Sequence, residues 1–264
     1  MIEAKDIQVV FNPGTAIENK ALRGMNLQIP ESQFVTVIGS NGAGKSTFLN
    51  VLAGEIKADA GSVKIDEQDV TNWSTARRSG LVARVFQDPM AGTCESLTIE
   101  ENLALASGRG QKRGFSHAVT AERRDLFREK ISVLGLGLEN RLEDKMGLLS
   151  GGQRQAVSLV MATLNPMKIL LLDEHTAALD PKTAAFVLEL TEKLVNEGQL
   201  TTMMVTHSMR QALDHGQRTV MLHEGRVVLD VEGDQRKNMK VEDLLHMFEK
   251  VRGEEIDDDK LLLS

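Results

Sequence analysis

The stretch GSNGAGKST, residues 39–47, places three glycines around one lysine and ends on two hydroxyl-bearing side chains. Its spacing, Gly39-x4-Gly44-Lys45-Ser46, is that of a phosphate-binding loop. The apolar run FVTVI (34–38) precedes it, and a segment with apolar residues at 48, 49, 51 and 52 follows it. A short, continuously apolar run favours a strand buried on both faces, as in a parallel sheet. The stretch therefore predicts a strand, a loop and a helix within an α/β fold.

Such a loop suits anionic oxygens for physical reasons. Glycines let successive backbone N–H groups curl inward, and the helix N-terminus adds its dipole. Lys45 is expected to neutralise charge on the β and γ phosphates, and the Ser46 hydroxyl to ligate Mg²⁺. By itself the pattern also fits a glycine-rich turn without a ligand. The residues expected to hold the nucleotide are Gly39, Ser40, Asn41, Gly42, Ala43, Gly44, Lys45, Ser46 and Thr47.

A second apolar run, ILLLDE (169–174), ends on two carboxylates. Asp173 is expected to hold Mg²⁺ through water, and Glu174 lies one position nearer the substrate. Two carboxylates at the end of a buried strand are costly unless a cation compensates them. Because strands ending in Asp-Glu are common, this motif is weak by itself.

A second glycine pair occurs in LSGGQ (149–153). Ser150 is placed to cap a helix, and Gly151 and Gly152 leave backbone amides open to an oxyanion. With Gln153 they form a second candidate phosphate site, separate in sequence from the first.

In this order the three motifs resemble the ATP-binding subunit of an ABC transporter, over roughly residues 1–235. The resemblance implies a P-loop NTPase (RecA-like) core with an N-terminal antiparallel β subdomain and an inserted α-helical subdomain at about 88–150. Residues 236–264 would form a C-terminal helix and an acidic tail. It also implies a head-to-tail homodimer in which the phosphate loop of one chain faces the LSGGQ helix of the other, with ATP between them.

Further residues match the family one by one. Gln87, after RVF, matches the glutamine that touches Mg²⁺ and the attacking water, and His207 matches the histidine that hydrogen-bonds the γ phosphate. Asp180 matches the aspartate linking the two sites across the dimer, and Phe11 the aromatic residue against adenine. Each also has an ordinary structural explanation: a polar strand end for Gln87 and His207, a helix cap for Asp180, and a core position for Phe11.

The resemblance implies Mg²⁺-dependent ATP hydrolysis with Glu174 as general base. Lys45 and a metal ion held by Ser46, Gln87 and Asp173 would stabilise charge, and His207 with the partner's Ser150 and Gly152 would complete the site. The energy would drive separate membrane permease subunits. Import is favoured, with an extracytoplasmic substrate-binding protein and an amino acid as one substrate class.

One position departs from the family pattern. The family usually has proline after the glutamate, whereas this chain has His175. We favour a solvent-facing substitution there; the alternative is that the loss of proline frees a backbone φ and places a titratable ring beside the expected base Glu174.

Bulk composition narrows the function classes. A net charge of −7 and a pI near 5.5 argue against a general nucleic-acid binder. The single cysteine, Cys94, cannot form an intrachain disulfide, which favours a reducing compartment. The N-terminus lacks the features of a signal peptide, and no window approaches the roughly 18–20 apolar residues of a membrane span. We therefore expect peripheral attachment at the cytoplasmic membrane face, through the permease.

Other patterns predict local structure. Helices are expected after Thr98, with Glu101 completing a capping box, across 120–135 with apolar positions at 126, 127, 131 and 134, and from Pro181. A hairpin is expected to turn near 224–225. Met90, Leu97 and Ile99 are expected either to line a groove for a permease helix or to pack in the core. Two rivals stay open: an ABC-type ATPase of translation or DNA repair, and a non-catalytic nucleotide-dependent scaffold.

Overall fold

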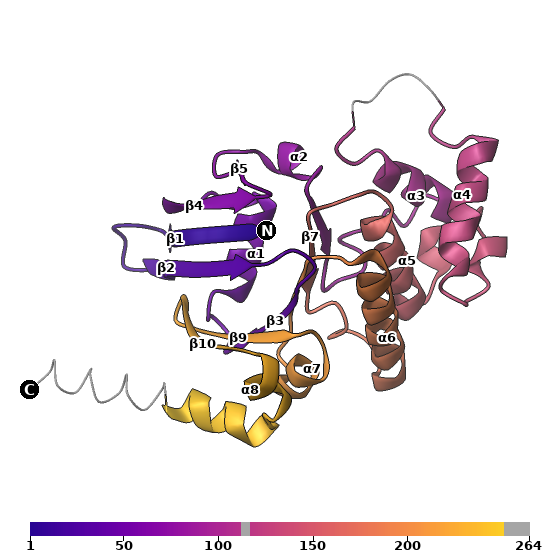
Figure 1. Cartoon of the computed structure of the whole chain (residues 1–264). Coiled ribbons are helices and arrows are strands. Elements are labelled where there is room, and N and C mark those ends of the chain that lie inside the picture. Colours follow the sequence, from indigo (N-terminus) through magenta and orange to yellow (C-terminus); the bar gives the residue numbers. More distant parts are fainter. Residues whose placement is uncertain (112–116, 251–264) are drawn as a thin grey trace, which may run out of the picture.

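The computed structural model describes residues 1–111 and 117–250. Within these ranges the chain forms a four-stranded antiparallel sheet, a six-stranded sheet that is parallel at its centre, and helices packed against them. In Figure 1 the antiparallel sheet and helices α3 to α6 lie on opposite sides of the molecule. The α/β fold with an N-terminal antiparallel sheet is confirmed.

The larger sheet contains the strand that precedes the phosphate loop. All of Phe34 to Ile38 is buried, and β3 pairs in parallel with β9 on one side and β8 on the other, as its continuous apolar run predicts. Its strands, in spatial order, are β10 (Arg226–Glu232), β9 (Arg218–His223), β3 (Phe34–Gly39), β8 (Thr202–Val205), β7 (Ile169–Asp173) and β6 (Val82–Val85).

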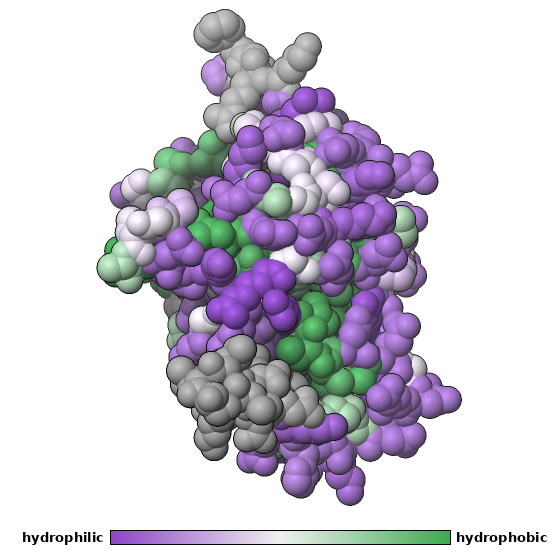
Figure 2. Space-filling model, turned by 90° about the vertical axis from the view of Figure 1, so that its left-hand side faces the viewer, coloured by the Kyte–Doolittle hydropathy of each residue, from purple (hydrophilic) through white to green (hydrophobic). Residues whose placement is uncertain are grey.

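The antiparallel sheet packs over helix α1 (Lys45–Ala53) and one face of the larger sheet, in a shared apolar core. Because successive side chains of a strand point to opposite faces, Met25, Leu27 and Ile29 of β2 all lie on the buried face. In spatial order the strands are β2 (Asn19–Ile29), β1 (Ile2–Phe11), β4 (Ala60–Ile65) and β5 (Gln68–Asp69); the short helix α2 (Thr75–Arg78) leads to β6. Figure 2 views the molecule from the left-hand side of Figure 1, and hydrophilic residues cover most of that face.

Helices α3 (Ile99–Ser107), α4 (Ala121–Ser132) and α5 (Gly151–Thr163) share a separate apolar core. The predicted capping box of α3 is present, because Thr98 accepts from the Glu101 N–H while Glu101 accepts from the Thr98 N–H. Phe127 and Ile131 are buried as expected, but Leu126 is exposed. Adjacent helical residues point in different directions, so Leu126 and Phe127 cannot both face this core.

The chain after α5 completes the sheet. Helix α6 (Pro181–Gly198) begins at its Asp180 cap with proline in the first turn, as predicted. Glu224 and Gly225, both at positive φ, turn the β9–β10 hairpin. Helix α7 (Met209–Asp214) precedes β9, and α8 (Gly233–Lys237) follows β10.

A C-terminal helix covers residues 241–250. Leu244 is fully buried against Ile38 and Met221, whereas Leu245 is exposed. The expected acidic tail lies outside the described residues.

Among residues 1–111 and 117–250, no helix combines the length and apolar character needed to span a bilayer.

Candidate active site

Four parallel strands bring the predicted site residues to one edge of the sheet. Strand β3 leads into the phosphate loop at Gly39, β7 ends at Asp173 just before Glu174, and β8 ends two residues before His207. Strand β6 ends two residues before Gln87. Because the carboxyl ends of parallel strands share an edge, segments far apart in sequence meet there.

The glycines of the phosphate loop are needed by the fold as well as by a ligand. Gly44 has φ 96°, and a Cβ on it would lie 2.6 Å from the carbonyl oxygen of Ala21. A Cβ on Gly39 would lie 2.3 Å from the Leu222 carbonyl oxygen. Both distances are far below contact, so the neighbouring hairpin and β2 leave room only for glycine.

Lys45 already lies in the curl of this loop. Its Nζ donates to the carbonyl oxygens of Gly39 at 2.8 Å and Ser40 at 2.9 Å, and the residue is 7% exposed. Burial lowers the pKa of the Lys45 ammonium, and the carboxylates of Glu174 and Asp173 oppose that shift. The loop therefore presents a pre-positioned cation beside exposed residues of the first helical turn.

The predicted metal-holding residues offer only hard oxygen donors. Ser46 and Gln87 are exposed, and within the described residues neither side chain makes a hydrogen bond. No three His, Cys, Asp or Glu side chains among those residues are grouped as metal ligands. Mg²⁺ commonly binds through one or two protein oxygens plus substrate phosphates, so this donor set fits a magnesium ion that arrives with a nucleotide.

Arg84 holds one oxygen of Asp173, which the sequence did not suggest. Its Nη2 donates to Asp173 Oδ2 at 2.7 Å, and its Nη1 donates to Asn50 and Glu55. The guanidinium also lies 4.7 Å from the centre of the Phe86 ring. The only signal was an arginine within the otherwise apolar strand VARV, where a charge needs a partner.

Glu174 stands at the end of β7 in an uncommon backbone conformation. Its φ is 44°, and its N–H donates to the Val205 carbonyl of β8 at 3.0 Å. The Nδ1 atom of His207 lies 3.5 Å from Glu174 Oε2. The two residues predicted to act on the γ phosphate and the water are thus adjacent.

The LSGGQ residues lie elsewhere in the same chain. Ser150 and Gln153 form a capping box, and among the described residues the amides of Gly151 and Gly152 make no hydrogen bond. A pocket of about 370 Å³ lies beside them, lined also by Lys182, Thr183 and Phe186 and by no residue of the phosphate loop. One chain therefore presents the two candidate phosphate sites apart.

Gly152 also has a packing reason to be glycine. A Cβ there would lie 2.0 Å from the Thr183 methyl group of α6, whereas a Cβ on Gly151 would meet only Leu179 at 3.6 Å. The two glycines thus differ in how freely each accepts a side chain.

Phe11 and Asp180 lie at the surface. Phe11 is 37% exposed at the end of β1, so it does not fill the core, and exposed Ile17 lies on the following turn. Asp180 Oδ1 accepts from the Thr183 N–H at 3.1 Å, and hydrogen bonds from Thr183 lower the pKa of its carboxyl group. The helix-cap explanation of Asp180 is therefore present in the structure.

The expectation that His175 faces solvent is wrong. The residue is 2% exposed, and its Nε2 lies 3.0 Å from Thr191 Oγ1 of α6. The ring turns inward because α6 packs on β7 and covers it. Burial, with a smaller contribution from the charge of His215, lowers the pKa of His175 to about 4.

This shift predicts a pH-dependent stability. The unfolded chain regains the ordinary pKa of about 6.5, so between pH 6.5 and 4 it binds more protons than the folded chain. His175 therefore lowers the free energy of unfolding as pH falls through that range, by about 2 kcal/mol between pH 7 and 4.5. Urea unfolding of the wild type should show this excess loss relative to His175→Gln. Equal pH dependence of the two proteins would contradict it.

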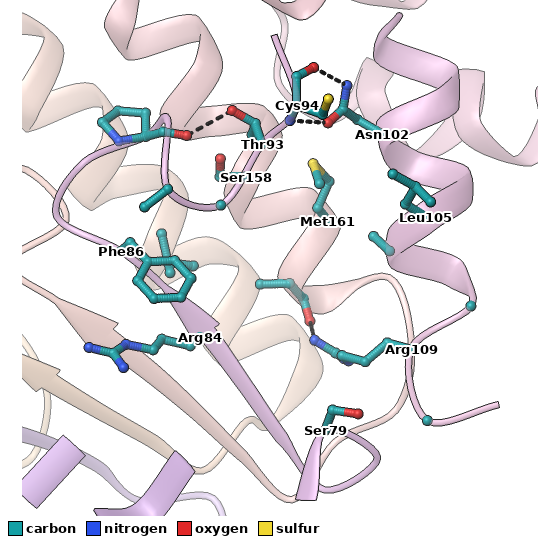
Figure 3. A pocket seen from close by; sticks show the side chains of 18 of the residues that line it. Ser79, Arg84, Phe86, Thr93, Cys94, Asn102, Leu105, Arg109, Ser158 and Met161 are labelled. Carbon is teal, nitrogen blue, oxygen red and sulfur yellow. Dashed lines mark hydrogen bonds between the residues drawn. The ribbon is translucent and has the colours of Figure 1, made fainter. Parts of the chain in front are cut away.

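A groove of about 970 Å³ lies between β6 and the helices α3 and α5 (Figure 3). Arg84, Phe86, Cys94, Leu105 and Met161 are among its lining residues. The core alternative is confirmed for Ile99, whereas Met90 neither packs in the core nor lines this groove. Ile99 is fully buried in the helical core, Leu97 does not line the groove, and Met90 is exposed outside it.

Residues that line the groove adjoin the predicted active site. Buried Gln155 of α5 donates to the Phe86 carbonyl at 3.1 Å, directly before Gln87. Arg109 donates to the Ala162 carbonyl of α5, a hydrogen bond drawn in Figure 3, so its guanidinium joins the chain after α3 to α5.

Comparison with known proteins gives consistent matches. A family model described as ABC transporter matches residues 22–177. The chain is 43% identical to a "Tyrosine transport ATP-binding protein" of Clostridioides difficile, over 94% of this chain and 99% of that protein. It is 35% identical to an "Aliphatic sulfonates import ATP-binding protein" of Rhizobium johnstonii, over 81% and 72%. A solved dimeric ATP-binding cassette in a post-hydrolysis state, bound to ADP and phosphate, has a TM-score of 0.75 at 31% identity, over 88% and 98%.

Proposed function

Because this chain belongs to the ABC transporter family and is an ATPase subunit of a transporter, we propose that it energises import of a small solute through separate permease subunits. Residues 1–235, with the helical part at about 88–150, form the ATPase unit in this proposal. Two copies assemble head to tail and enclose ATP between them.

One observation supports a nucleotide site that is shared between two chains. Within a single chain the amides of Gly151 and Gly152 make no hydrogen bond among the described residues, and Gly152 lines a pocket that contains no phosphate-loop residue. A helix N-terminus attracts anions, so a phosphate is expected there. A second copy supplies that phosphate when its own loop (39–47) holds ATP, and closure of the dimer then depends on ATP because the dipole otherwise faces solvent.

Each chain's residues have distinct roles in the proposed hydrolysis. Glu174 accepts a proton from the attacking water, Lys45 neutralises charge on the β and γ phosphates, and His207 hydrogen-bonds the γ phosphate. Ser46, Gln87 and Asp173 would hold Mg²⁺, which supplies further charge stabilisation when bound. Phe11, which is exposed at the end of β1, stacks on adenine.

We place the permease at the groove of Figure 3. The groove has room for the end of a short helix, and its wall leads directly to Gln87 and Arg84. Movement of a permease helix there can reach the residues that contact the nucleotide. This placement is consistent with attachment to the cytoplasmic membrane face through the permease.

Crosslinking from Cys94 tests this placement. Cys94 is exposed, lines the groove and is the chain's single cysteine, so no other cysteine needs removal. In an active reconstituted complex, Cys94 should crosslink to a cysteine introduced into a cytoplasmic helix of the permease. The control is Cys94→Ser/Glu197→Cys, whose thiol is exposed outside the groove lining. An equal yield from the control, or none from Cys94, would refute the placement.

The transported molecule is proposed by analogy. The relative named for tyrosine transport is similar along almost its whole length, which favours an amino acid delivered by an extracytoplasmic substrate-binding protein. Copurification of the native complex, followed by mass spectrometry of its subunits and bound ligand, tests this. A complex that contains a permease but no binding protein would reject that part of the proposal.

A further inference from the structure

The turn that carries Glu174 is held mainly by hydrogen bonds. Glu174 has a φ of 44°, in a region that non-glycine residues seldom adopt and that the surroundings must maintain. Its N–H donates to Val205, and its carbonyl accepts from the Ala177 N–H at 2.9 Å. These bonds fix the turn to β8 and to itself.

Packing restrains the Glu174 side chain, which is 21% exposed, less than it restrains the buried residues that follow it. A cavity of about 170 Å³ lies beside it, lined by Glu174, His175, Thr206, His207 and Gln211 among others. Where side chains face a cavity, they lack the close contacts that restrain a packed core. Directed bonds must therefore fix the backbone from which the Glu174 side chain extends.

His175 provides such a bond to a different element. Thr191 is 1% exposed and donates its hydroxyl proton to the Val187 carbonyl at 2.7 Å. With that proton in use, the 3.0 Å contact between His175 Nε2 and Thr191 Oγ1 requires the ring N–H to donate. The residue after Glu174 is thus tied to the middle of α6.

We propose that His175 is a positioning residue, which holds Glu174 in its working place by anchoring the turn to Thr191 of α6. This inference rests on the proposed role of Glu174 as general base. Helix α6 begins at Asp180, which we expect to reach across the dimer, so the base and this helix move as one unit. A proline at position 175, which the family usually has, carries no side-chain donor that could bond Thr191.

Two single substitutions and their combination test the anchor. Thr191→Val keeps the side-chain shape and removes the hydroxyl, and His175→Leu removes the donor. We expect each to lower kcat about tenfold with KM for ATP unchanged, since misplacement of a base affects the chemical step. The double variant should be no slower than the slower single variant. His175→Gln, whose amide can still donate, should recover most of kcat.

The matched control is Thr163→Val. Thr163 makes the same backbone-directed hydroxyl bond, to Leu159 at 3.0 Å, in helix α5 and away from Glu174. Its kcat should equal that of the wild type. Rates are expressed per ATP-binding site, so that unfolded protein does not count. Wild-type kcat in both Thr191→Val and His175→Leu, or additive losses in the double variant, would overturn the proposal.

The Glu174→Gln variant separates this inference from the proposed function. If Glu174→Gln abolishes turnover while the anchor variants keep the wild-type rate, only the role of His175 fails. If Glu174→Gln itself turns over ATP normally, the base is misassigned and both proposals fail.

Discussion

Glu174→Gln should lower kcat for ATP hydrolysis at least about 100-fold, because the amide cannot accept a proton from water. ATP binding should persist, since the substitution keeps size and leaves Lys45 and the phosphate loop unchanged. Removal of the negative charge near the γ phosphate also favours a dimer held by unhydrolysed ATP. Phosphate release measures the rate of ATP hydrolysis, and light scattering after size-exclusion chromatography with ATP shows whether the dimer forms.

Glu224→Gln is a matched control for this experiment. Glu224 also has a positive φ, of 42°, but it lies in the exposed β9–β10 turn, paired with Arg23. Loss of one carboxylate there should leave kcat unchanged. Wild-type turnover by Glu174→Gln would reject Glu174 as the base.

A mixture of two inactive variants should regain activity if the site is shared between chains. Lys45→Ala removes the phosphate-binding cation, and Gly151→Asp places a carboxylate where the partner's γ phosphate is expected. Gly151 suits this test because a Cβ there meets nothing closer than 3.6 Å, so the variant should fold. We expect each variant alone to lose at least about 100-fold in kcat. In their heterodimer, one site has an intact loop facing an intact LSGGQ helix.

An equal mixture should recover up to about a quarter of the wild-type rate, because half of the dimers are mixed and each has one intact site. Mixing Lys45→Ala with Glu174→Gln is the control. Both residues act from the same side of the site, so no heterodimer contains an intact one. No recovery in the first mixture, despite formation of the heterodimer, would show that the site is not divided between chains.

Local patterns predicted most of the elements around the site. The loop after β3, the capping box at Thr98, the helix cap at Ser150 and the Asp180-Pro181 helix start each depend on residues within a few positions of one another. Their interactions are complete within one turn or one strand end. By contrast, the convergence of Gly39, Asp173 and His207 depends on the parallel pairing of β3, β8 and β7, which the structure supplies.

Met90, Leu97 and Ile99 show what local sequence patterns cannot predict. Whether Ile99 faces a groove or a core depends on how α3 packs against α4 and α5. In the structure Ile99 packs in the core that these helices share. Exposure of Phe11 likewise depends on what covers the end of β1. Neither outcome is encoded within a few residues.

By itself, the sequence determined the phosphate loop, the succession of strands and helices along the chain, and the family, because these depend on short-range geometry and backbone chemistry. Only the tertiary structure decided what surrounds Asp173 and the turn that carries Glu174. Arg84 reaches Asp173 across 89 positions, and Thr191 reaches His175, the residue after Glu174, across 16. The physical reason is that burial and pairing of a polar side chain depend on which elements the fold brings over it. The packing of α6 on β7 therefore turned a residue expected in solvent into a buried anchor.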